Sequence, residues 1–91
     1  MVNIWIKLEQ YEKALELSNH LIEYDGENPI NFRRRSCIYQ NLGKYQDALE
    51  DLQRAQDLAK RNGNAQEMVL IKQEKLKIDI INRQESYWLI D

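Results

Sequence analysis

The sequence predicts an all-α protein that folds as one small domain over residues 1–91. Three glycines and one proline in 91 residues provide too few turns for a fold of many short strands. Apolar residues recur at helical spacing rather than by alternation, as in the run Ala48, Leu49, Leu52, Ala55 and Leu58. Hydrophobic residues make up 43% of the chain and charged residues 31%, which suits a folded domain with one core.

Three chain breaks divide the sequence into predicted helices. In the first break, Gly26 can take the left-handed conformation that ends a helix, Asn28 can cap the next helix and Pro29 suits its first turn. Gly43 marks the second break, and Asn62-Gly63-Asn64 marks the third. The predicted helices are therefore residues 2–8, 10–24, 29–42, 45–60 and 64–89.

The composition argues against an enzyme or a metal centre. Cys37 is the single cysteine and His20 the single histidine, so no disulfide, zinc cluster or Cys/His catalytic pair is expected. No glycine-rich phosphate loop or serine elbow appears. The acidic residues Asp47, Glu50, Asp51 and Asp57 are predicted to form a solvated helix face. We therefore expect no catalytic residue, no cofactor and no metal.

The charge balance and hydropathy narrow the possible partners. Thirteen basic and fifteen acidic side chains leave a formal net charge of −2, which does not favour nucleic-acid binding. No apolar run approaches the roughly 18 residues of a membrane span, and the N-terminus lacks a signal-peptide pattern. We expect a cytoplasmic protein with no membrane partner.

An internal repeat lies within the first sixty residues. The segment Tyr11-Glu-Lys-Ala14-Leu15-Glu16 returns 34 residues later as Tyr45-Gln-Asp-Ala48-Leu49-Glu50. The pairs Ile4 and Ile38, Trp5 and Tyr39, and Leu8 and Leu42 follow at the same offset. A period of 34 in a helical sequence is the length of a tetratricopeptide helix–turn–helix unit.

Residues 29–60 resemble one complete tetratricopeptide repeat. The small, tyrosine and alanine positions of the family pattern are matched by Ser36, Tyr39, Ala48 and Ala55. Arg35 departs from the pattern, because the family places a leucine there. The resemblance implies a truncated first repeat at 1–28, a complete repeat at 29–62, and a capping or extended helix at 63–91. In that last helix, Val69, Leu76, Ile80 and Tyr87 are predicted to share one stripe, with residues 72–75 facing solvent.

The resemblance also implies a non-catalytic module that binds a protein or peptide partner. The residues expected to face the concave groove are Ile30, Arg33, Arg34, Cys37 and Asn41, with Asn3 and Lys7 from the truncated helix. Arg34 matches an arginine with which co-chaperone repeats grip acidic chaperone tails, although Ile30 stands where their lysine would be. The alternative is that the arginines form a solvated face whose surface salt bridges contribute little.

Two apolar regions predict self-association. The last turns contain Tyr87, Trp88, Leu89 and Ile90, which either overhang the repeat and meet a partner or fold back onto the core. Immunophilin-type co-chaperones have a similar extended final helix. The truncated first repeat leaves Leu15, Leu21 and Ile22 without their usual cover. We therefore expect a homodimer, formed by exchanged or docked helices, or a place within a longer repeat array.

Overall fold

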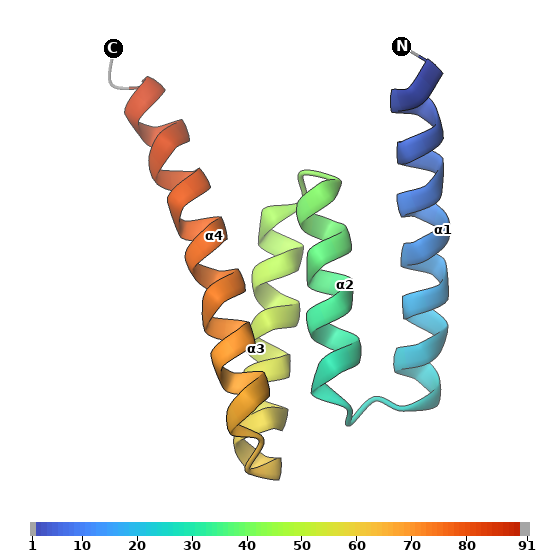
Figure 1. The fold of residues 1–91 in the computed structure, drawn as a ribbon, viewed down its shortest axis with the longest axis vertical. Coiled ribbons are helices and arrows are strands. Elements are labelled where there is room, and N and C mark those ends of the chain that lie inside the picture. The colour runs from blue at the N-terminus through green and yellow to red at the C-terminus, as the bar shows by residue number, and fades with distance from the viewer. Residues whose placement is uncertain (1, 90–91) are drawn as a thin grey trace.

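The computed structural model contains four helices in a row. The structure describes the backbone of residues 2–89 and the side chains of residues 8–83. The helices are α1 (Val2–Tyr24), α2 (Pro29–Asn41), α3 (Tyr45–Asn62) and α4 (Ala65–Leu89). Figure 1 shows α1 and α4 at the two ends of the row, with α2 and α3 between them. The predicted all-α class is confirmed, and none of the described helices is long and apolar enough to cross a membrane.

Polar caps and two glycines set the ends of α2, α3 and α4. The side chain of Asn28 accepts a hydrogen bond from the Ile30 N–H at 3.0 Å, and Pro29 occupies the first turn of α2. Asn64 similarly accepts from the Glu67 N–H at 3.1 Å. Gly43 and Gly63 have φ angles of 76° and 67°, in the left-handed region that glycine favours. These predicted breaks are confirmed.

The turn between α1 and α2 differs from the prediction. Gly26 is not among the residues with positive φ, so the expected left-handed stop at this position is wrong. Instead the Asp25 N–H bonds to the Leu21 carbonyl at 2.8 Å, which extends the helical hydrogen bonding past Tyr24. The break is therefore made by the start of α2, at Asn28 and Pro29, rather than by a glycine cap.

The predicted break between residues 8 and 10 is also wrong, because α1 is one continuous helix from Val2 to Tyr24. The repeat itself explains the difference. The residue 34 positions before Gly43 is Glu9. A residue with a Cβ atom is disfavoured at positive φ, so nothing at Glu9 ends the helix in the way that Gly43 ends α2.

The hydrophobic core lies along α3, which packs against α2 and α4. Ala48, Leu52, Ala55 and Ala59 of α3 are each 0% exposed. Small residues on one stripe allow neighbouring helices to approach closely, and Leu52 fills the space between the alanines. The other core residues are Phe32, Leu58, Ile71 and Ile78, with Ile22, Tyr39, Tyr45, Leu49 and Met68 packed at its edge.

The inward face of α4 is not the stripe predicted from the sequence. Ile71 and Ile78 are fully buried, whereas Val69, Leu76 and Ile80 are 55%, 60% and 54% exposed. The side chain of Tyr87, the fourth member of the predicted stripe, lies outside the described residues. The sequence of α4 contains two apolar stripes, and Ile71 and Ile78 lie beside polar residues, Glu67 and Glu74, that hydrogen-bond to α2.

Candidate protein-binding surfaces

Arg33 connects α2 to α4. Its Nε donates to Glu67 Oε2 at 2.8 Å and its Nη2 donates to Glu67 Oε1 at 3.2 Å, so the pair is bidentate. The hydrogen bond to Glu67 raises the pKa of Arg33, although burial acts in the opposite direction. Glu67 is only 5% exposed. The predicted groove residue Arg33 is thus neutralised by a carboxylate of its own chain.

Arg35 connects α2 to α3 and α1. Its guanidinium donates to both carboxylate oxygens of Asp51 at 2.7 and 2.6 Å, and to Asn19 Oδ1 at 3.0 Å. It also lies over the rings of Phe32 and Tyr39, 5.6 and 5.7 Å from their centroids. The Asp51 hydrogen bond raises the pKa of Arg35 despite burial.

Asp51 corrects one prediction from the sequence. It was expected on a solvated face with Asp47, Glu50 and Asp57, but it is only 5% exposed. Its position follows from Arg35, which stands where the family pattern has leucine. A cation held partly out of water on α2 is stabilised by a matching anion on α3. The other three acidic residues are exposed, with Asp57 accepting a hydrogen bond from Gln53 at 3.2 Å.

Cys37 and Gln40 lie on the part of α2 beside α4, whereas Asn41 is exposed. Gln40 donates to Glu74 at 2.9 Å, and Asn41 donates to the Cys37 carbonyl of its own helix at 2.9 Å. Cys37 is half-buried, and burial is the main cause that raises the pKa of its thiol, followed by the nearby charge of Glu74. Glu67, Ile71, Glu74 and Ile78 share one face of α4. Because Arg33 binds Glu67 and Gln40 binds Glu74, this face lies against α2, and Ile71 and Ile78 point inward.

Of the three consecutive arginines Arg33, Arg34 and Arg35, it is Arg34 that faces solvent. Among the described residues it makes no ion pair, and it lines a groove of about 210 Å³ between α1 and α2. Ile30, another predicted groove residue, is half-buried at the start of α2. The side chains of Asn3, Lys7, Tyr87, Trp88, Leu89 and Ile90 lie outside the described residues. The residues around the α1/α2 groove are Ala14, Leu17, Ser18, Leu21, Asn31, Arg34 and Ile38.

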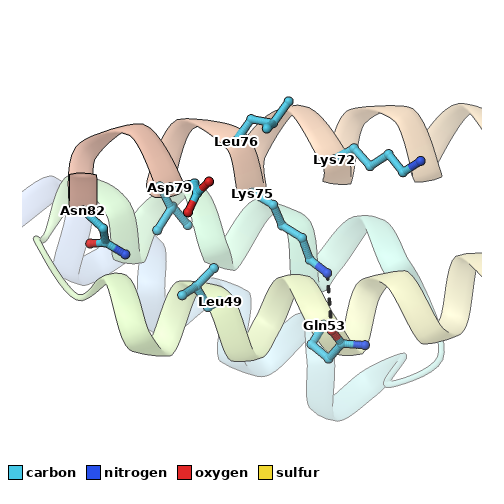
Figure 2. Close-up of a pocket in the computed structure, with 8 residues that line it drawn as sticks. Leu49, Gln53, Lys72, Lys75, Leu76, Asp79 and Asn82 are labelled. Atoms are coloured by element: carbon cyan, nitrogen blue, oxygen red, sulfur yellow. Dashed lines mark hydrogen bonds between the residues drawn. The ribbon is translucent and has the colours of Figure 1, made fainter. Parts of the chain in front are cut away.

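A larger groove, of about 460 Å³, lies between α3 and α4 (Figure 2). The Lys75 ammonium crosses it to donate to Gln53 at 3.3 Å and also contacts Gln56. Figure 2 shows Leu49 projecting from α3 toward α4, while Leu76 points outward from α4. The residues around the α3/α4 groove are Leu49, Gln53, Lys72, Lys75, Leu76, Ile78, Asp79 and Asn82.

The α3/α4 groove was not predicted from the sequence. The one signal for it was the second apolar stripe of α4, which sequence periodicity could not distinguish from the buried one. Three of the residues around this open groove are apolar and five are polar or charged, which suits an amphipathic helix rather than a purely apolar one. Within the described residues, no group of three or more His, Cys, Asp and Glu side chains could hold a metal ion.

Comparison with known proteins gives a match to one family model and to relatives that include the following two. Residues 30–62 match the family model of the tetratricopeptide repeat. The chain is 30% identical over 82 residues to Protein DIA2 of Eremothecium gossypii, a match that covers 90% of this chain and 12% of that protein. It is 23% identical over 79 residues to Outer envelope protein 61 of Arabidopsis thaliana, covering 87% and 14% respectively. No solved structure matches the chain at a comparable level of significance.

Proposed function

We propose that the chain binds an amphipathic helix of a protein partner in the α3/α4 groove. The support comes from residues 30–62, which match the tetratricopeptide repeat, a family of non-catalytic scaffolds for protein–protein interaction. The chain spans less than one sixth of the length of the two relatives, so their own activities carry no argument here. We place the interaction in the cytoplasm, where the thiol of Cys37 would stay reduced.

The exposure of Leu76 carries the proposal. Its side chain lies at the rim of a groove of about 460 Å³ and is 60% exposed. Val69 and Ile80 lie on the same side of α4 and are exposed to a similar degree. Together the three residues form an exposed apolar strip on the outer face of α4, with Leu76 at the rim of the groove, and burying such a strip contributes roughly 25 cal/mol per Å² of apolar surface.

The charges around this strip indicate the chemistry of the partner. Lys72, Lys77 and Arg83 are exposed on the outer side of α4, where Asp79 is the one exposed carboxylate among residues 65–83. The two other acidic residues of this segment, Glu67 and Glu74, face α2 and are paired there. The partner helix is therefore expected to have acidic residues flanking its apolar face, which would speed association and fix its orientation.

Binding tests should use a display library of amphipathic helical peptides selected against the 91-residue chain. We expect enriched peptides with acidic flanks whose binding is lost in Leu76→Glu and retained in Leu17→Glu. Leu17 is 62% exposed on α1, so this control introduces the same charge at an equally exposed leucine far from the groove. Equal loss in both variants, or failure to enrich any peptide, would contradict the proposal.

Arg34 supports a second candidate function, the binding of an acidic C-terminal tail. Its guanidinium is exposed and makes no ion pair among residues 8–83, unlike those of Arg33 and Arg35. A carboxylate could therefore reach Arg34 without displacing an existing partner. An acidic peptide whose affinity falls in Arg34→Ala, with no change in melting temperature, would favour this candidate. Equal losses in Arg34→Ala and in a substitution of exposed Arg54 would indicate diffuse charge attraction instead.

A further inference from the structure

Two exposed apolar stripes lie at opposite ends of the molecule. The α1 stripe consists of Leu17, Leu21 and Tyr24, which are 62%, 41% and 92% exposed. The α4 stripe consists of Val69, Leu76 and Ile80, which are 54% to 60% exposed. Each set lies on a single helix face, at spacings of three, four or seven residues. Because α2 and α3 separate α1 from α4 (Figure 1), the two stripes of one chain do not meet.

The internal repeat shows what kind of element covers the α1/α2 groove. Ala14, Ser18 and Leu21 of α1 stand 34 residues before Ala48, Leu52 and Ala55 of α3. On α3 these three positions are 0% exposed because α2 and α4 pack over them. On α1 the equivalent residues border an open groove, where Ser18 is buried, Ala14 is half-buried and Leu21 is exposed. The α1/α2 groove is therefore the equivalent, one repeat earlier, of the surface of α3 that neighbouring helices cover. A helix is the kind of element that would cover this groove.

The charges on the two helices are opposite. Residues 8–24 of α1 contain four glutamates and one lysine, and Glu9, Glu16 and Glu23 follow one another at intervals of seven. The outer side of α4 carries the basic residues Lys72, Lys77 and Arg83 described above. Two of these three basic residues are already paired within α4, Lys77 with Glu74 and Arg83 with Asp79, each at 3.2 Å, and on α1 Lys13 is paired with Glu9 at 3.6 Å. Such exposed pairs contribute little and can exchange partners.

We propose that α4 of one copy packs against α1 of a second copy, with the α4 stripe seated in the α1/α2 groove. The two helices are matched in length, with 25 and 23 residues. The inference rests on the proposed function, because the same strip of α4 is used, and it names a second copy of this chain as a ligand. A contact between two different surfaces is heterologous, so each copy keeps one free stripe and the assembly grows head to tail.

A mixing experiment with two variants tests this arrangement. Leu17→Glu blocks the α1 stripe and Leu76→Glu blocks the α4 stripe, and both residues are too exposed for either change to unfold the chain. By sedimentation equilibrium, each variant alone should remain at 10.9 kDa, while the 1:1 mixture should form a complex of twice that mass and no larger.

The wild-type chain should show a mass that rises with concentration beyond the dimer. Higher salt should weaken both assemblies, because opposite charges flank the contact. Circular dichroism of each variant controls for folding.

Three outcomes would overturn the inference. Dimers of Leu17→Glu alone would indicate a symmetric contact through α4, and dimers of Leu76→Glu alone would indicate one through α1. A wild-type chain that remains monomeric at millimolar concentration would remove self-association entirely. If the monomeric chain still selects Leu76-dependent peptides from the library, the proposed function stands without this inference. If no peptide is selected but the mixed variants pair, the groove is an assembly surface only, and the proposed function fails.

Discussion

Helices α1 and α3 contain the same six-residue pattern but have different environments. Ala48, Leu52 and Ala55 of α3 are completely buried. Their counterparts on α1 border an open groove, where Ser18 is 6% exposed but Ala14 is only half-buried and Leu21 is 41% exposed. The pattern is therefore sufficient to make a helix with a small-residue stripe. Burial of that stripe depends on whether a neighbouring helix is present on the correct side. Substitutions at matched positions of the two helices test this difference.

Leu52→Ala should produce the largest loss of stability. It removes a fully buried side chain and leaves a cavity between α2 and α3, which costs about 2–5 kcal/mol. In the dissociated chain, Leu21→Ala on the exposed groove of α1 should cost under about 1 kcal/mol. Urea denaturation monitored by circular dichroism measures both values. Comparable losses would mean that the α1 groove is covered in solution.

Arg35→Ala should be the next most damaging change. It leaves Asp51 buried without its cation and removes the contact to Asn19 that helps to hold α1, at a cost of about 2–4 kcal/mol. Arg34→Ala is the matched control, and its effect should stay within about 0.5 kcal/mol because the side chain is exposed. If the double variant Arg35→Leu with Asp51→Leu recovers most of the stability, the loss in Arg35→Ala is due to the unpaired carboxylate.

Ala48→Leu and Ala14→Leu compare the two copies of one repeat position. Ala48 is 0% exposed, so the larger side chain should overpack the α2–α3 contact and cost about 1–3 kcal/mol. Ala14 is half-buried beside an open groove, and Leu there should cost under about 1 kcal/mol. Thermal melts of the two variants measure the loss of stability in each. A neutral Ala48→Leu would show that Ala48 does not lie at a close crossing.

The smallest effect concerns the contact between α2 and α4. Burial by itself would raise the pKa of Glu74, but hydrogen bonds from Gln40 and Lys77 outweigh it and lower the pKa. Ionised Glu74 therefore contributes stability above its unfolded pKa, and this contribution is lost as the pH falls through the lower folded value. Gln40→Leu should cost about 1 kcal/mol at pH 7 and less at pH 3. Gln73→Leu, on the exposed side of α4, is the control. A cost for Gln40→Leu that does not depend on pH would show that the carboxylate of Glu74 is not involved.

Local chemistry accounts for the parts of the fold that were predicted correctly. Asn28 with Pro29, Gly43 and Gly63 with Asn64 act within one turn of the chain, so their caps and breaks could be predicted without knowing the tertiary structure. The groove residues were harder to predict, because Arg33, Arg34 and Arg35 are adjacent in sequence but face three different neighbours. Whether each arginine is free or paired depends on acidic residues 16 or 34 positions away.

By itself the sequence determined the helical class, the 34-residue repeat and the ends of α2, α3 and α4, because spacing and caps are properties of short segments. Only the tertiary structure decided which stripe of α4 is buried, because Ile71 with Ile78 and Leu76 with Ile80 are equally apolar. The difference arises from Glu67 and Glu74, which bind Arg33 and Gln40 and so orient α4. Hydrophobic burial is non-directional, and a few charged or hydrogen-bonded pairs are enough to choose between two similar faces.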